Sequence, residues 1–181
     1  MSELPVPEPR LREIFNLVER AIESRWGIPV AIRDVPPPFT GDLDGERIDL
    51  DHDLPIDEAL FILLHLFGHT VQWNASEETR ALGLAPVKDP TDELLAEIEA
   101  YEREAGRYST QLLHELGIFE LDQWLADFTD ADVRYLLHFY RTAEKLPLEQ
   151  VWRGSQPPIE PAPIPHFQPT RWLSRSDGVV I

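Results

Sequence analysis

The fold is decided by residues 55–73, which read PIDEALFILLHLFGHTVQW. Pro55, followed by the acidic pair Asp57 and Glu58, is typical of a helix start, because proline fits the first turn and acidic side chains favour the positive end of the helix dipole. Residues 59–67 are apolar except for one histidine. A helix that is apolar on most sides is buried. We therefore expect a central helix around which the rest of the chain packs.

Two histidines, His65 and His69, share one face of this expected helix. At a four-residue spacing their directions differ by only about 40°, so both imidazoles can reach one metal ion. The chain contains no cysteine, which leaves histidine and carboxylate as its transition-metal ligands. A catalytic zinc site of the two-histidine type needs a carboxylate as the third protein ligand.

A second expected helix supplies that carboxylate. It follows Asp89 and Pro90, read here as its cap and first residue, and runs to about Leu116 before Gly117. At 100° per residue its apolar stripe contains Leu94, Leu95, Ile98, Ala105, Ser109, Leu112, Leu113 and Leu116.

Glu102 falls inside this stripe, whereas five other glutamates of the helix point away from it. A buried carboxylate is unfavourable unless it is paired or bound to a metal. We therefore predict a metal site of His65, His69 and Glu102, with Glu99 as the next-best ligand if the helix is rotated.

These segments resemble a known family. Residues 64–72, LHLFGHTVQ, are similar to the HELGH segment of the ImmA/IrrE metallopeptidases, and residues 102–109, EREAGRYS, are similar to their later ExxANxFA helix. The resemblance spans about residues 39–116. It implies a zincin-like fold, with His65, His69 and Glu102 as zinc ligands.

Two positions depart from the family pattern. Leu66 stands where the family keeps the glutamate that activates the metal-bound water, and Gly106 replaces a small polar residue. A general base typically contributes about 10²- to 10⁴-fold to the rate, and leucine cannot accept a proton. Glu58 lies two turns away, about 10 Å along the helix axis, too far to replace it directly. Peptide hydrolysis by the usual route is therefore expected to be crippled.

Three functional hypotheses follow. The first is a zincin-like, catalytically impaired protein that keeps zinc or another divalent metal and acts as a binding or regulatory module for a protein or peptide partner. The second is a working metal-dependent peptidase or hydrolase with a non-standard base, drawn from the C-terminal arm or from the loop around Glu77 and Glu78. The third is a metal-free helical interaction module in which the three side chains hydrogen-bond to one another.

The remaining pattern predicts an α+β fold that is helix-rich, with a small β-hairpin or sheet packed on the buried metal-site helix. Apolar periodicity predicts a helix over residues 8–26. A strand at residues 30–32 and a hairpin over residues 39–50, turning at Asp44-Gly45, follow it. A loop is expected around Gly83 and Pro86. Two more helices are expected, one over residues 119–127 and one over residues 130–145, the latter capped by Thr129.

The chain is expected to form one zincin-like domain, residues 1–146, and a proline-rich arm, residues 147–181, that packs on the body or on a partner. The arm has six prolines after position 156, which favour extended backbone, and three large aromatic residues that can pack: Trp152, Phe167 and Trp172.

Charge and hydropathy exclude several classes of partner. The 33 acidic and 16 basic residues give a formal charge of −17, which repels nucleic acid and anionic lipid. No apolar run approaches the roughly 18 residues of a membrane span, and no secretory leader is visible, so we expect a cytoplasmic protein. The sequon at Asn74 is taken as chance. His114, His138 and His166 are interpreted as packing or surface residues.

Overall fold

The structure, a computed structural model, describes residues 4–172. It is a helix-rich α+β fold with one small sheet. In chain order the elements are α1 (Glu8–Trp26), β1 (Val30–Arg33), β2 (Gly41–Leu43), β3 (Ile48–Asp51), α2 (Ile56–Ala75), α3 (Glu77–Leu84), α4 (Asp92–Glu115), α5 (Asp122–Thr142) and α6 (Leu148–Val151). The last nine residues of the expected C-terminal arm, 173–181, lie outside the described residues.

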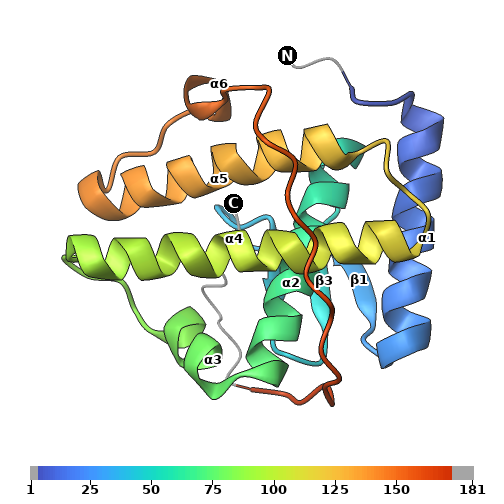
Figure 1. The fold of residues 1–181 in the computed structure, drawn as a ribbon, viewed down its shortest axis with the longest axis horizontal. Helices are drawn as coiled ribbons and strands as arrows, with labels where there is room; N and C mark the ends of the chain where they lie inside the picture. Colours follow the sequence, from blue (N-terminus) through green and yellow to red (C-terminus); the bar gives the residue numbers. More distant parts are fainter. Residues whose placement is uncertain (1–3, 173–181) are drawn as a thin grey trace.

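Helix α2 is the centre of the molecule, as the sequence predicts. The sheet packs on one side of it, α4 crosses it on the other, and α1 lies alongside (Figure 1). An unbroken run of fourteen buried residues extends from Leu60 to Trp73. This burial matches the mostly apolar composition of the segment, and it places both histidines deep inside the molecule.

The sheet has three strands in the order β1-β3-β2. The expected hairpin is confirmed: β2 and β3 are antiparallel, with Leu43 opposite Ile48 and Gly41 opposite Leu50. Gly45 in the connecting turn has a φ of 99°, a conformation that glycine adopts without strain. Strand β1 pairs parallel to β3, and the hairpin strand β2 lines the side of α2 that carries the histidines.

Three local expectations are wrong. Residues 122–142 form one continuous helix, α5, instead of two; Thr129 lies buried in its interior, and no glycine or proline interrupts the segment. The loop expected around Gly83 contains α3, whose first turn is capped by the Ser76 side chain. Helix α4 starts two residues later than expected, because Thr91 accepts a hydrogen bond from the Leu94 amide and is the actual cap.

The proline-rich segment after α6 runs in extended conformation across α4 (Figure 1). Its backbone is held at Ala162, whose amide donates to the Arg107 carbonyl at 3.3 Å. Further on, Trp172 donates its amide to the Asp44 carbonyl at 2.7 Å. The Asn74 side chain accepts from the Thr170 amide and donates to the Gly45 carbonyl. Asn74 thus links the segment to the hairpin turn at Gly45.

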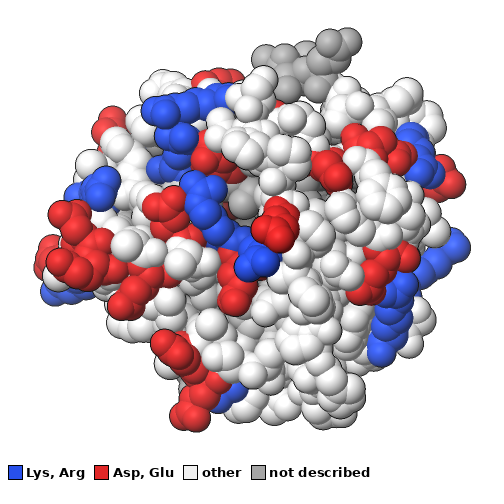
Figure 2. Space-filling model, viewed as in Figure 1, with Lys and Arg blue, Asp and Glu red and all other residues white. Residues whose placement is uncertain are grey.

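Charged side chains are unevenly spread over the face seen in Figure 2. Basic side chains gather over α4 and α5, and acidic ones surround them. Arg103 bridges Glu99 and Asp130, and Arg134 also pairs with Asp130. Opposite charges are therefore interspersed here despite the strong net negative charge. Within residues 4–172, no helix is both long and apolar enough to cross a lipid bilayer.

Candidate metal centre

Close contact between α2 and α4 brings the candidate ligands together. Gly68 lies between the two histidines on α2, and a Cβ atom there would lie only 2.8 Å from the Ala105 carbonyl carbon. The absence of a side chain allows the two helices to approach this closely. As a result, His65 and His69 from α2 meet Glu102 from α4.

The three predicted side chains converge through one atom each. His69 Nε2 lies 3.1 Å from His65 Nε2 and 3.0 Å from Glu102 Oε2. His65 Nε2 lies 3.7 Å from the same carboxylate oxygen. All three residues are buried. The group has the composition and the proximity needed to hold a metal ion.

These separations suit a tetrahedral ion. Zinc with bonds of about 2.0–2.1 Å to nitrogen and oxygen separates neighbouring ligand atoms by about 3.3–3.4 Å. The three distances given above lie on both sides of that value. The donor set, two imidazole nitrogens and one carboxylate oxygen, is also one that zinc accepts.

Hydrogen bonding around Gln72 fixes the proton of His69. The Gln72 amide nitrogen donates to the Tyr101 carbonyl at 2.8 Å and to a Glu104 carboxylate oxygen at 2.6 Å. Its oxygen therefore faces His69 Nδ1, 2.8 Å away, which must be the donor. In neutral His69 the lone pair on Nε2 then points at the Glu102 carboxylate. Two lone pairs facing each other are unfavourable unless a proton or a metal ion lies between them.

His65 has a similar arrangement. Its Nδ1 faces an oxygen of Asp132, a buried carboxylate on α5, at 3.7 Å. Burial, together with the neighbouring His69, lowers the pKa of His65 to about 3, although the Glu102 carboxylate opposes the shift. Burial also raises the pKa of Asp132 well above its usual value, and Glu102 adds to that rise. His65 is thus neutral at ordinary pH, the form that binds metals.

The surroundings of the cluster are tight. A hollow of about 40 Å³ adjoins it, lined by β2, α3, α4 and α5 as well as by α2. The Tyr101 ring stacks on His69 with ring centroids 4.6 Å apart, and its hydroxyl accepts from the Trp73 indole at 2.8 Å. A volume of this size suits an ion with about one water molecule, and an extended peptide needs far more space.

Leu66 is directed away from the cluster. It is completely buried, and its Cδ1 atom would contact a side chain added at Gly41 on β2. It is part of the main hydrophobic core. The position that carries the base in the resembled family is therefore part of the apolar packing between α2 and the sheet in this chain.

The other histidines and carboxylates considered from the sequence lie elsewhere. His114 bonds to Asp122 at 2.8 Å, and His138 lies 3.2 Å from Glu144. Glu99 pairs with Arg103 on the outer side of α4. Glu58 and His166 are exposed. None of these five belongs to the buried group of His65, His69 and Glu102.

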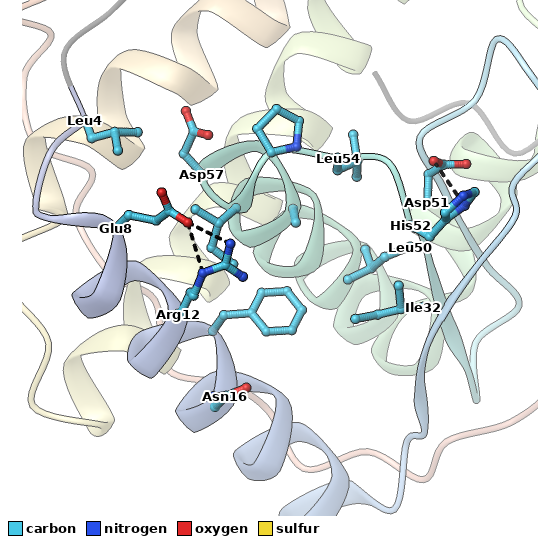
Figure 3. Close-up of a pocket in the computed structure, with 14 residues that line it drawn as sticks. Leu4, Glu8, Arg12, Asn16, Ile32, Leu50, Asp51, His52, Leu54 and Asp57 are labelled. Atoms are coloured by element: carbon cyan, nitrogen blue, oxygen red, sulfur yellow. Dashed lines mark hydrogen bonds and ion pairs between the residues drawn. The ribbon is translucent and has the colours of Figure 1, made fainter.

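A larger hollow, of about 540 Å³, lies between α1, the sheet and the start of α2 (Figure 3). None of the three candidate ligands lines it. On its rim Asp51 and His52 approach Asp34 closely enough to form a second cluster of ligand atoms, which is largely exposed. Both Asp51 oxygens already accept backbone amides, those of Val35 and Asp53. This cluster therefore has weaker donors than the buried one.

Sequence reasoning missed two residues next to the ligands, Gln72 and Asp132. A usable signal was present for both. Gln72 lies three residues after His69, on the same side of α2. Asp132 lies four residues after Phe128 and three before Tyr135, so a projection of α5 as one helix places it on the buried face.

Comparisons with protein-family models, with curated proteins and with solved structures found no match to this chain.

Proposed function

We propose that this protein is a zincin-like metal-binding protein in which His65, His69 and Glu102 hold a divalent ion, with zinc as the best fit. The ion supplies positive charge between three buried lone pairs and joins α2 to α4. In this proposal the protein has lost peptidase activity and acts as a binding or regulatory module for a protein or peptide partner.

One observation carries the proposal: the outward nitrogen of each imidazole faces an oxygen acceptor while both inward nitrogens face one carboxylate. His69 Nδ1 donates to Gln72, and His65 Nδ1 faces Asp132. Ligand histidines in metal sites usually donate their second nitrogen to such an acceptor, which fixes the tautomer and aims the lone pair. A histidine pair that served packing alone would have no need for matching acceptors on both outer sides.

Two features argue against peptide hydrolysis. Leu66 supplies no base and lies in the apolar core, and the adjoining hollow of about 40 Å³ is too small for a peptide. A hydrolase must admit its substrate to an open position on the metal. The role assigned to the ion is therefore to stabilise one arrangement of the helices, on which a partner surface depends.

Metal analysis of protein purified without chelator tests the proposal. We expect about one zinc ion per chain, its loss in His69→Ala and Glu102→Gln, and its retention in the control His138→Ala, which alters a histidine outside the cluster. Added zinc should raise the Tm of the metal-free wild type, because a ligand at 100 times its Kd stabilises by about 2.7 kcal/mol.

The metal-free alternative makes the opposite prediction. If His69 is a protonated partner of Glu102, purified protein contains no stoichiometric metal, and zinc leaves the Tm unchanged. In that case the proton shared between Nε2 and the carboxylate should be visible by NMR. That pair of results would refute the proposed function.

A further inference from the structure

Asp132 is a buried carboxylate that helix packing does not explain. It is 3% exposed, and its Oδ2 lies 3.7 Å from His65 Nδ1. This is slightly longer than a hydrogen bond. An ionised carboxylate in the interior is unfavourable unless a positive charge lies nearby, and an ion bound by His65 would supply that charge.

The other buried aspartates of α5 have evident structural roles. Asp127 accepts the Gln156 amide at 2.7 Å and the Gln123 side chain at 3.0 Å, which fastens the chain beyond α6. Asp130 pairs with two arginines. Only Asp132, among these three, is directed at the candidate metal centre.

We propose that Asp132 is the outer carboxylate of the metal centre: it accepts a hydrogen bond from Nδ1 of His65 and so aims Nε2 at the ion. This inference rests on the proposed function. Asp132 is a positioning residue, because it acts on the ion through His65. It makes α5 the third helix of the centre, beside α2 and α4.

Charge balance supports this assignment. A divalent ion, two neutral imidazoles and the carboxylates of Glu102 and Asp132 sum to zero charge. A buried site is most stable when its charges cancel locally, since each uncompensated charge in a low-dielectric interior is costly. With Glu102 alone the buried group would keep one positive charge.

With Asp132 in this role, each histidine has an acceptor beside its Nδ1 atom. The Gln72 oxygen already occupies the outer side of His69 at 2.8 Å, and Asp132 occupies the corresponding side of His65. A shift of less than about 1 Å brings Asp132 within hydrogen-bond distance. A carboxylate acceptor makes the imidazole a more basic ligand than an amide acceptor does, so the loss of Asp132 should weaken metal binding measurably.

The test compares Asp132→Asn with Asp127→Asn, a matched change at a second buried aspartate of the same helix. Zinc affinity is measured by competition with a chromophoric chelator. We expect Asp132→Asn to bind zinc about 10- to 100-fold more weakly than wild type and Asp127→Asn to stay within about twofold. Equal affinity of Asp132→Asn and wild type would overturn the inference.

Two spectroscopic measurements make the result independent of any loss of stability. In zinc-loaded wild type, the NMR signal of a proton on His65 Nδ1 should be sharp and strongly downfield, and in Asp132→Asn it should move upfield. The visible spectrum of the cobalt-loaded protein should keep its tetrahedral pattern in both. A change of coordination in Asp132→Asn would mean that Asp132 is itself a ligand, and would refute the positioning role.

The two proposals fail differently. If wild type binds no metal, the proposed function fails. If wild type binds zinc and loses it in Glu102→Gln but not in Asp132→Asn, only the role of Asp132 fails.

Discussion

At the scale of single residues, consecutive positions of α2 face two different environments. His65 faces the polar cluster, whereas Leu66, one position further on, faces Gly41 and the sheet. Successive residues of a helix differ by about 100° in direction, so this division follows from the backbone. A substitution at position 66 therefore tests the packing of the core in this chain.

Replacement of Leu66 by glutamate should destabilise the protein without creating a peptidase. A carboxylate would enter the apolar core against β2, where it finds no partner, and we expect the free energy of unfolding to fall by roughly 3 kcal/mol or more. Denaturant unfolding measures this loss, and Leu66→Met should change stability by less than about 1.5 kcal/mol. A stable Leu66→Glu protein that cleaves peptides would contradict both the packing argument and the assigned loss of activity.

The candidate ligands could be predicted from sequence because each lies on a face that helical geometry alone defines. The spacing of His65 and His69 and the inward position of Glu102 needed no knowledge of the tertiary fold. Asp132 was missed although the expected helix over residues 130–145 contains it, because that helix begins only two residues before Asp132 and leaves out Phe128, the buried residue four positions earlier. The capping signal at Thr129 competes with the absence of glycine and proline from residues 122–142, and the structure contains one continuous helix.

At the scale of elements, the candidate metal centre depends on how closely α2 and α4 cross. The crossing point is Gly68 against the backbone of Ala105. Ser109 reinforces it by donating its hydroxyl to the Leu64 carbonyl at 2.8 Å. Gly106, next to this crossing on α4, instead faces Thr129 of α5 and Ile159 of the extended segment.

Two glycine-to-alanine variants should therefore behave differently. In Gly68→Ala the new methyl group overlaps backbone atoms of α4 and forces the helices apart, so we expect a loss of about 1–3 kcal/mol of stability and weaker zinc binding. In Gly106→Ala the nearest atoms are side-chain methyl groups at 3.2 and 3.4 Å, which can adjust. Its higher helix propensity, worth up to about 1 kcal/mol, should offset the contact.

Thermal unfolding and chelator competition on both variants provide the measurement. Equal effects of the two changes would show that the crossing is not the point of closest approach. Sequence alone could not distinguish these glycines, because both lie inside helices and the difference arises only from what packs against them.

The short helix α3 also could not be predicted from the sequence alone. Its eight residues, EETRALGL, lack a clear apolar stripe, and Gly83 weakens the helical signal. In the structure, a Cβ atom at Gly83 would lie 2.5 Å from the Trp73 indole nitrogen. Packing against Trp73 thus favours the helix despite its weak sequence signal. Position 83 needs glycine because a side chain there would overlap the indole.

At the scale of the whole molecule, the extended C-terminal segment connects distant parts of the fold. Trp172 donates its indole N–H to Asn74 at 3.2 Å, and the Arg80 guanidinium lies 3.7 Å above its ring. Arg80 belongs to α3, and α3 contributes Leu82 and Gly83 to the lining of the hollow beside the candidate metal centre. The segment therefore contacts α3, and α3 in turn forms part of the wall beside the candidate site.

This chain of contacts predicts that Trp172 controls how fast the ion is released. Trp172→Ala removes the ring under Arg80, an interaction worth about 0.5–2 kcal/mol, so α3 should open more often. We expect chelator-driven release of zinc to accelerate by about 2- to 30-fold. The equilibrium affinity should change less, because no ligand is altered. Trp172→Phe, which keeps a ring for Arg80, should release zinc at nearly the wild-type rate, and equal rates in all three proteins would show that the segment does not act on the site.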